Sequence, residues 1–371
     1  MDLVLLLQRF QSPPGNKEKE AMTHKDTMIG LFKTAKGPGN LALRDAPVPS
    51  PARNEVLIEI KAAGICGTDI HIKHDEFPYW PPVILGHEFS GVIVEAGKEV
   101  TGFRVGDRVV GEPHTRACGK CYLCRTGNIQ ICAQKRSPGW GIDGAFARYL
   151  TMPEHLLHPI PDSMSFEEAA VVEPAANVVQ DVIERGRVEP NEFVVINGPG
   201  PIGLMAVMAA KLSGAGTIVM VGASVDEDKR LPLARELGAD EVIVADKQDA
   251  VARVMDMTNG RGANLVVEAS GAAPAVRASV QMLRKLGRIT AIGLTGKPEI
   301  AFPWDVAMSK VLTVLFNMST GYTCWDRTIG LIASGKMPVR KIISHIEPLE
   351  NWEPTFEAVE SKRALKALLI P

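Results

Sequence analysis

The sequence has little net charge, few cysteines and no long hydrophobic run, and these absences exclude several classes of protein. The formal net charge of the 371 residues is −2, so no basic surface indicates a nucleic-acid or anionic membrane partner. The apolar segment 3–7 is too short to span a bilayer, and it lacks the basic start of a secretory signal. We therefore expect a cytoplasmic protein whose partner is neither nucleic acid nor membrane.

The composition is that of an ordinary globular protein, without internal repeats or low-complexity tracts. Hydrophobic residues make up 46% of the chain, which gives each of two expected domains enough apolar surface for a core. Residues 11–27, with Pro13-Pro14-Gly15 and alternating charges, are typical of a flexible lead. We therefore expect residues 1–27 to form a flexible N-terminal extension and the fold to begin at Met28.

Most of the few cysteines lie in one short polar segment. Four of the six form a C-x2-C-x2-C-x7-C pattern, at Cys118, Cys121, Cys124 and Cys132. Four thiolates so close in sequence can converge tetrahedrally on one Zn²⁺, whereas cysteines separated by two residues are strained disulfide partners. Two local disulfides or a redox pair are the alternatives. Such a zinc site is closed to substrate, so we expect it to fold a lobe and the chemistry to lie elsewhere.

The pattern of hydrophobic residues changes along the chain. Short β-rich runs broken by glycine and proline, such as 55–60 and 91–94, indicate that the first half is mostly β. Ser165 and Glu168 match a capping box that opens an alanine-rich helix towards Glu173. Continuous apolar runs separated by helical stretches follow, as in strands buried on both faces. These runs lie at 194–196, 218–221, 242–244, 265–267 and 289–292.

This alternation of strands and helices predicts an α/β fold. Residues 178–319 are expected to form one domain around a doubly wound parallel sheet. Residues 28–177 are expected to form a β-rich domain that the tail, 320–371, rejoins.

A strand, a G-x-G-x-x-G turn and a helix start follow one another at residues 194–203. Gly198 allows the tight turn, Gly200 lets the backbone approach a pyrophosphate, and Gly203 lets the helix pack closely on the strand. The helix N-terminus supplies amides and a positive dipole end for the phosphates. Because four further β/α alternations follow, we interpret this pattern as a dinucleotide-binding fingerprint. The expected cofactor contacts here are Gly198, Gly200, Pro201, Ile202 and Gly203.

The choice between NAD and NADP depends on the end of the second strand of this domain. An acidic residue that binds the adenosine ribose is expected there, but Gly222 follows the strand instead. A small neutral turn leaves room for a 2′-phosphate, which favours NADP(H). The residues expected to meet that phosphate are Ser224, Lys229 and Arg230. The alternative is an NAD site in which Asp226 or Asp228 reaches back to the ribose.

A second group of metal-ligand residues is drawn from distant points of the chain. Cys66, His87 and Glu88 lie in segments that flank the first strands, and Glu173 closes the predicted helix. Mixed sulfur, nitrogen and oxygen ligands are typical of a zinc site that keeps one position open for water or substrate. Considered alone, each of these residues has a purely structural explanation, as a buried cysteine, a core histidine or a surface carboxylate. The combination predicts a Lewis-acid site.

On these motifs the sequence resembles the zinc-containing medium-chain dehydrogenases of the alcohol dehydrogenase superfamily over residues 28–371. Within that family it is similar to the polyol (sorbitol-type) and L-threonine dehydrogenases. The segments that carry this similarity are Cys66-Gly67-Thr68-Asp69-Ile70-His71, Gly86-His87-Glu88 with Gly91, Gly97 and Val100, the pair Glu173-Pro174, the four-cysteine lobe and the glycine turn. The resemblance implies a GroES-like catalytic domain beside a Rossmann cofactor domain.

The resemblance also implies roles for single residues. The catalytic zinc would be held by Cys66, by His87 and by Glu88 directly or through a water, with Glu173 as a direct or exchangeable fourth ligand. Asp69 would accept the proton of the His87 imidazole. Thr68 and His71 would relay the released proton outward, or His71 would be a buried structural residue. The aromatic residues of the segment 76–80, together with Glu76, are candidates to line the substrate pocket or to pack on the surface.

We therefore expect an enzyme that binds two zinc ions and uses NAD(P) to oxidise a secondary alcohol reversibly to a ketone. The substrate would be a small molecule, a polyol or a hydroxy amino acid, and the protein a homo-oligomer, either dimer or tetramer. One alternative is a metal-free quinone or enoyl reductase on the same fold, which the presence of the second ligand group argues against. The other is a non-catalytic nucleotide-binding protein, which would have no reason to keep Thr68 and His71 beside metal ligands.

Overall fold

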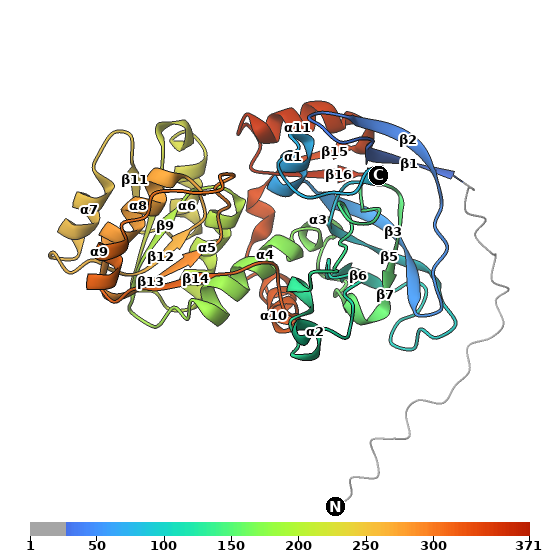
Figure 1. The fold of residues 1–371 in the computed structure, drawn as a ribbon, viewed down its shortest axis with the longest axis horizontal. Coiled ribbons are helices and arrows are strands. Elements are labelled where there is room, and N and C mark those ends of the chain that lie inside the picture. Colours follow the sequence, from blue (N-terminus) through green and yellow to red (C-terminus); the bar gives the residue numbers. More distant parts are fainter. Residues whose placement is uncertain (1–26) are drawn as a thin grey trace, which may run out of the picture.

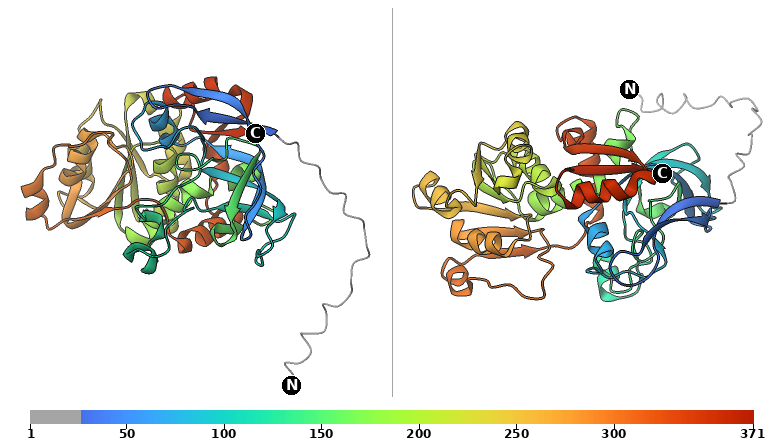
Figure 2. Two further views of the ribbon diagram at one scale, coloured as in Figure 1. Left: turned by 45° about the vertical axis from the view of Figure 1, so that its right-hand side comes forward. Right: turned by 90° about the horizontal axis from the view of Figure 1, so that it is seen from above.

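The structure is a computed structural model that describes residues 27–371 (Figure 1). The extension expected over residues 1–27 lies outside this range except for Thr27, the first residue of β1. Two bodies lie side by side in both figures of the whole chain, one rich in strands and one with helices around a sheet (Figures 1 and 2). None of the helices in the described range is long and apolar enough to cross a membrane.

The β-rich body contains two sheets. The smaller sheet has the strand order β2-β1-β4, and the larger has the order β15-β16-β3-β5-β6-β8, with β7 also paired to β3. β3 is the centre of the larger sheet, and its β-branched residues Val56, Ile58 and Ile60 are buried. The strands are β1 (Thr27–Lys33), β2 (Leu41–Pro47), β3 (Glu55–Gly64), β4 (Val83–Ile84), β5 (Glu88–Ala96), β6 (Arg108–Gly111), β7 (Tyr149–Pro153), β8 (Leu157–Pro159), β15 (Ile343–Pro348) and β16 (Lys366–Ile370).

The C-terminal strands lie in the same sheet as the first strands of the chain. β16 pairs antiparallel with β3, with Leu368 opposite Gly64, and parallel with β15. The red C-terminal elements accordingly lie among the blue N-terminal ones in Figure 1. This pairing brings residues of the tail next to the segment that follows β3. The helices of this body and of its junction are α1 (Gly67–Lys73), α2 (Tyr122–Arg125), α3 (Phe166–Ala169), α4 (Val172–Val178), α10 (Tyr322–Ala333) and α11 (Trp352–Glu360).

The second body is built on a parallel sheet with the order β11-β10-β9-β12-β13-β14 in the described range. Residues alternate between its two faces. Ile196 and Met220 share a core with α5 and α6, whereas Val195 and Val219 share another with α7 and α8. Burial on both faces explains the continuous apolar runs. The elements are β9 (Phe193–Asn197), α5 (Pro201–Leu212), β10 (Thr217–Gly222), α6 (Arg230–Leu237), β11 (Glu241–Val244), α7 (Ala250–Met257), β12 (Ala263–Glu268), α8 (Ala273–Met282), β13 (Leu283–Ala291), α9 (Trp304–Ser309) and β14 (Thr313–Phe316).

The order of this sheet reverses next to β9. β10 lies on one side of β9 and β12 on the other. In open parallel sheets such a switch point, at the carboxyl ends of the strands, is where ligands bind. The glycine turn follows β9 directly and therefore lies at this switch point.

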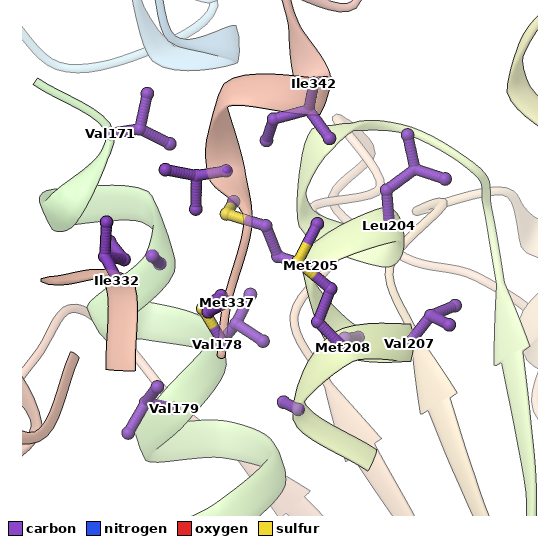
Figure 3. Close-up of a cluster of buried hydrophobic side chains, with 14 of the residues drawn as sticks. Val171, Val178, Val179, Leu204, Met205, Val207, Met208, Ile332, Met337 and Ile342 are labelled. Atoms are coloured by element: carbon purple, nitrogen blue, oxygen red, sulfur yellow. The ribbon is translucent and has the colours of Figure 1, made fainter. Parts of the chain in front are cut away.

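The two bodies are joined by a shared hydrophobic core. Val178 and Val179 lie opposite Met205 and Met208 of α5, with Met337 between them, as Figure 3 shows. Side chains of α4, and of the π-helix at Val179–Arg185 that continues it, therefore pack against the parallel-sheet body. Glu173, which is a residue of α4, therefore lies at the junction of the two bodies.

The helix expected from Ser165 to Glu173 is in fact two helices. The predicted capping box is present, since the Ser165 hydroxyl accepts from the Glu168 N–H and the Glu168 carboxylate from the Ser165 N–H. α3 ends at Ala169, and α4 begins at Val172. Pro174 explains the break, because proline fits the first turn of a helix but would clash with the preceding turn of a continuous one.

Candidate active site

Three of the four predicted catalytic-zinc residues lie together. The Cys66, His87 and Glu88 side chains can each place one ligand atom within 4.8 Å of the others. Cys66 precedes α1, and the other two residues enter β5. The antiparallel pairing of β3 with β5 sets Glu88 opposite Gly64, two residues before Cys66. A Cβ on Gly64 would lie 2.2 Å from Glu88 Oε2, so only glycine leaves room for this carboxylate.

Glu173, the fourth predicted ligand, is buried nearby but does not belong to this group of three. Its carboxylate accepts a hydrogen bond from Asn177 Nδ2 at 3.1 Å, one turn along α4. Burial raises the pKa of Glu173, and the neighbouring His87 acts in the opposite direction. Asn177 was not predicted as part of the site, although its i+4 spacing from Glu173 on a helix could have indicated the contact.

Lys366 is a further residue of the site that the sequence analysis missed. This lysine, on β16, is fully buried and forms an ion pair with Glu88 Oε2. Its ammonium also donates to the Ile65 carbonyl at 2.8 Å. A lysine inside the otherwise apolar run 364–370 was a signal, because buried lysines are almost always paired. Its partner could not be read from the sequence, since the two residues are far apart along the chain.

The role expected for Asp69 is not what the structure shows. Its Oδ1 lies 3.9 Å from His87 Nδ1, which is beyond hydrogen-bonding distance. Its Oδ2 instead accepts from the Cys66 N–H at 2.9 Å, at the start of α1. Asp69 therefore positions the backbone of Cys66 and acts on the imidazole of His87 only through its charge.

The donor atoms of this group are suited to a cation. His87 Nδ1 and Glu88 Oε1 are buried without a hydrogen-bond partner in the described range, whereas Glu88 Oε2 faces Lys366, and an unpartnered buried atom costs about 1–3 kcal/mol. Although burial favours the neutral ring, the charges of Cys66, Asp69 and Glu173 raise the pKa of His87 to about 10. Sulfur, imidazole and carboxylate donors together fit Zn²⁺.

The four cysteines of the predicted structural site also converge. All four thiols lie within 4.8 Å of one another. The Sγ atoms of Cys118 and Cys124 are 3.9 Å apart, and those of Cys121 and Cys132 are 4.0 Å apart. A tetrahedron with Zn–S bonds of ~2.3 Å has edges of about 3.8 Å. All six cysteines are free, so the alternative of two local disulfides is not what the structure contains.

Backbone amides prepare these thiols for a metal. The Cys121 N–H donates to Cys118 Sγ at 3.4 Å, and the Cys118 N–H donates to Cys132 Sγ at 3.4 Å. The amides of Cys118 and Gln134 lower the pKa of the Cys132 thiol to about 6, whereas burial raises the pKa of the Cys124 thiol to about 12. Hydrogen bonds of this kind favour the thiolate, which is the form that binds zinc.

Thr68 and His71 share one face of α1, close to the first ligand. Thr68 Oγ1 accepts from Cys66 Sγ at 3.6 Å, and His71 Nδ1 lies 2.8 Å from Glu76 Oε2. The His71 side chain is 34% exposed, so it is not a buried structural histidine. α1 lies on the side of the β-rich body that faces the parallel-sheet body (Figures 1 and 2).

The aromatic residues after α1 divide into two groups. Tyr79 is buried, and its hydroxyl contacts Asp75 and accepts from the Gly37 N–H at 3.1 Å, so it serves the fold. Phe77 and Trp80 pack instead against Trp140, each with ring centroids 5.8 Å apart. These three rings form an aromatic wall between the segment after α1 and the segment after the four-cysteine lobe.

The glycine turn has the geometry that the fingerprint requires. Gly198 has φ +96°, and a Cβ on Gly203 would lie 1.9 Å from the Gly198 carbonyl oxygen. A Cβ on Gly200 would meet nothing within 4 Å, so its backbone faces open space. Pro201 is the first residue of α5, with Ile202 next. As predicted, Gly198 makes the tight turn, Gly200 leaves the backbone accessible, and Gly203 allows close packing of the helix on the strand.

The three residues expected to bind a 2′-phosphate differ in their exposure and in their hydrogen-bond partners. Ser224 donates its N–H to Asp246 at 2.8 Å, and its hydroxyl donates to the same carboxylate. Lys229 is exposed and has no side-chain partner in residues 27–371. Arg230 donates to the Lys362 and Ala364 carbonyls at 3.3 and 3.0 Å, and its guanidinium also lies 3.8 Å from Asp226 Oδ1. Of the alternative ribose ligands, Asp228 is exposed, whereas Asp226 is buried and accepts from the Ala223 N–H at 3.0 Å, beside Gly222.

Comparison with known proteins gives two family matches. Residues 52–162 match the alcohol dehydrogenase GroES-like domain, and residues 201–334 match the zinc-binding dehydrogenase family. The sorbitol dehydrogenase of Halalkalibacterium halodurans is 37% identical, with 93% of this chain and 99% of that protein covered. The D-arabitol-phosphate dehydrogenase of Enterococcus avium is 35% identical, with coverage of 92% and 97%. The L-threonine 3-dehydrogenase of Bacillus licheniformis is 36% identical, with coverage of 93% and 99%.

Solved structures show the same architecture. A Sinorhizobium meliloti protein whose crystal structure contains NADP superposes with a TM-score of 0.86 and 30% identity. The superposition covers 94% of this chain and 100% of that one. Both the β-rich body and the parallel-sheet body are therefore present in the neighbour.

Proposed function

The chain belongs to the zinc-containing medium-chain alcohol dehydrogenase superfamily, and from that premise we propose that it oxidises a secondary alcohol to a ketone with NAD(P)⁺. The substrate class we propose is a polyol or a hydroxy amino acid, as in the relatives named above. The observation that carries this proposal is the convergence of Cys66, His87 and Glu88 in a buried group with unpartnered donor atoms. A metal-free reductase would not need such a group.

We propose two zinc ions per chain, one in each ligand group. Cys66 and His87 hold the catalytic ion, and Glu88 and Glu173 are the two carboxylates that can complete its coordination. Lys366 neutralises Glu88, so Glu173 is the carboxylate free to join or leave. Bound at this site, zinc supplies the Lewis acidity that lowers the pKa of a substrate hydroxyl. The free thiols of the second group suit a reducing, cytoplasmic location.

The two bodies have different proposed roles, one in catalysis and one in cofactor binding. We propose that residues 28–177 and 320–371 form the catalytic domain, which the pairing of β16 with β3 supports. Residues 178–319 form the cofactor domain around the switch point beside β9. Gly198, Gly200, Pro201, Ile202 and Gly203 cradle the pyrophosphate, because the turn leaves the backbone of Gly200 open.

Thr68 and His71 conduct the proton away from the substrate hydroxyl. The Thr68 hydroxyl lies beside Cys66 and accepts the proton, and His71 passes it outward. Glu76 holds the Nδ1 side of the imidazole, which leaves Nε2 to exchange the proton.

Replacing His71 by alanine is expected to lower kcat about 10²-fold at low buffer concentration, the usual size for a lost acid–base group. Added imidazole should restore part of the rate, since it can carry the proton in place of the side chain. The measurement is kcat across a pH series with and without imidazole. His74→Ala is the matched control, since His74 is one turn on and pairs with Glu360. Equal pH profiles for wild type and His71→Ala would return His71 to a structural role.

For the cofactor we propose NADP(H). The Ser224 N–H and hydroxyl converge on one anion, the Asp246 carboxylate, and a 2′-phosphate would take the same donors once that carboxylate turned away. The exposed Lys229 is near in sequence and free to bind it. Gly222 contributes no opposing carboxylate. We leave Arg230 out of this site because its guanidinium is held by Asp226 and by a carbonyl of the C-terminal segment.

Lys229→Ala is expected to raise the KM for NADP⁺ roughly tenfold and to leave the KM for NAD⁺ unchanged, because a bond to a charged group is lost from one cofactor only. The control is Lys247→Ala, an exposed lysine of the same region that pairs with Glu227. Steady-state kcat/KM for both cofactors measures the effect. A wild type that prefers NAD⁺ tenfold or more would contradict the NADP assignment and favour the ribose ligands Asp226 or Asp228.

We propose a homo-oligomer whose interface includes β14. This strand is an edge of the parallel sheet, and an unpaired edge can pair with a second copy. Large apolar side chains are exposed near it, among them Trp304, Met308, Val311 and Phe316. Light scattering of the purified chain measures its mass, and a monomer would contradict the proposal.

The experiment that tests the function is a panel of alcohols. Formation of reduced cofactor from NAD(P)⁺, followed by its near-ultraviolet absorbance, is expected with neutral polyols, polyol phosphates or hydroxy amino acids. Consumption of NAD(P)H is not expected with quinones or enones. Reduction of an enone without any alcohol oxidation would favour the reductase alternative. Cofactor binding without turnover of any substrate would favour a non-catalytic nucleotide-binding protein.

A further inference from the structure

We propose that Lys135 binds an anionic group on the alcohol substrate, a carboxylate or a phosphate, while the hydroxyl to be oxidised lies at the Cys66, His87 and Glu88 group. This inference rests on the proposed function and narrows its substrate class. It would make this chain a dehydrogenase that prefers charged alcohols to neutral polyols.

The first observation is that Lys135 is a charged residue without an anionic partner in the described range. The side chain is half-buried, and it forms neither an ion pair nor a hydrogen bond with any residue in the range 27–371. A partly desolvated ammonium without a counter-ion is unfavourable, so an anion that reached it would be bound strongly.

The second observation places Lys135 beside the catalytic site. The segment that carries it packs against the residue before His87, since a Cβ on Gly139 would lie 2.9 Å from the backbone of Gly86. The Lys135 Nζ lies 5.8 Å from the centroid of Trp140, within reach of a cation–π contact. Trp140 belongs to the aromatic wall that begins after α1, the helix of the proton relay. Lys135 is therefore near both the metal group and the segment that follows the relay.

The third observation is that the backbone around Lys135 is held from both sides. Its N–H donates to the Cys132 carbonyl at 3.0 Å, which ties it to the four-cysteine lobe. The next residue, Arg136, donates its N–H to the Thr115 carbonyl at 3.0 Å and stacks its guanidinium on Trp80 at 3.9 Å. Ser137 then bonds the Pro113 carbonyl. A fixed cation can select a substrate by the distance between its anionic group and its reacting hydroxyl.

A structural role is the competing explanation. Lys135 could balance the charge of the zinc thiolates, since Cys132 acts on it electrostatically. That role predicts a loss of zinc or of stability when the charge is removed, with all substrates affected alike. Substrate binding predicts a loss that depends on the charge of the substrate.

The test compares Lys135→Gln with Lys120→Gln in the zinc-loaded full chain. Lys120 is the matched control because it lies in the same cysteine lobe and is exposed. The substrates are sorbitol as the neutral alcohol, L-threonine as the carboxylate and D-arabitol phosphate as the phosphate. Lys135→Gln is expected to raise the KM of the charged substrate roughly ten- to hundredfold and to change sorbitol oxidation less than about twofold. A raised KM for L-threonine identifies the bound anion as a carboxylate, and a raised KM for D-arabitol phosphate identifies it as a phosphate.

A binding measurement complements the kinetics. Inorganic phosphate, titrated calorimetrically into the zinc-loaded protein, should bind the wild type and Lys120→Gln and should bind Lys135→Gln at least tenfold more weakly. Lys135→Arg keeps the charge and should keep oxidation of the charged substrate within a few-fold. The zinc content of all variants should equal that of the wild type.

Two failures can be told apart. A wild type that oxidises sorbitol and rejects both charged alcohols overturns this inference alone, as does a Lys135→Gln variant that loses zinc or slows all substrates equally. A wild type that oxidises no alcohol overturns the proposed function, and this inference falls with it.

Discussion

Replacing Cys66 by serine is expected to lower kcat/KM by about 10³-fold or more while the chain stays folded. The Lewis acidity of a catalytic zinc contributes several kcal/mol to the transition state, and serine is a far weaker zinc ligand than a thiolate. The fold should tolerate the change, since serine is a favourable residue before a helix. Its N–H can keep the bond to Asp69 Oδ2, which is 2.9 Å long.

Cys324→Ser is the control for this prediction. Cys324 is buried, and its thiol donates to the Gly321 carbonyl at 2.8 Å. It belongs to neither ligand group, and a serine hydroxyl can make the same bond. The control should therefore keep full activity. Normal turnover in Cys66→Ser would remove the catalytic role from this residue.

Replacing Cys121 by serine is expected to destabilise the protein by several kcal/mol, because the binding free energy of a structural zinc is part of the folding free energy. The lobe at residues 118–132 contains no strand. Its regular structure is limited to α2 and a short 3-10 helix at Ile129–Ile131. Cys132 is the buried member of the four cysteines. Metal ligation therefore substitutes for a hydrophobic core in this lobe.

Thermal unfolding of the two cysteine variants separates the two sites. Cys121→Ser should unfold at lower temperature and lose activity only as folded protein is lost. Cys66→Ser should unfold close to the wild-type temperature and be inactive throughout. Equal loss of stability with retained turnover in both variants would contradict the assignment of one structural and one catalytic zinc.

Much of the site could be predicted because its residues form local motifs. The four cysteines are near one another in sequence, so their convergence follows from spacing. The roles of Gly198, Gly200 and Gly203 follow from the turn that joins β9 to α5, and the structure shows the geometry expected of each. The parallel sheet was predictable because strands buried on both faces lack polar residues.

Other features depend on contacts between distant segments and could not be predicted. Lys366 meets Glu88 only because β16 returns to pair with β3. The Arg230 guanidinium is held by carbonyls of the C-terminal segment as well as by Asp226. The expected bond between Asp69 and His87 is absent because the nearer N–H, that of Cys66, takes one carboxylate oxygen and leaves the other at 3.9 Å. Spacing along the chain does not report such competition between partners.

The measurement that most directly tests the central claim is the zinc content of the purified chain, determined by elemental analysis together with that of the two cysteine variants. Two distinct ligand groups predict about two zinc ions per wild-type chain. They predict about one in Cys66→Ser, where the remaining ion resists chelation because its site is closed. A wild type that holds one zinc or none after metal-replete purification, yet oxidises alcohols at full rate, would contradict the account.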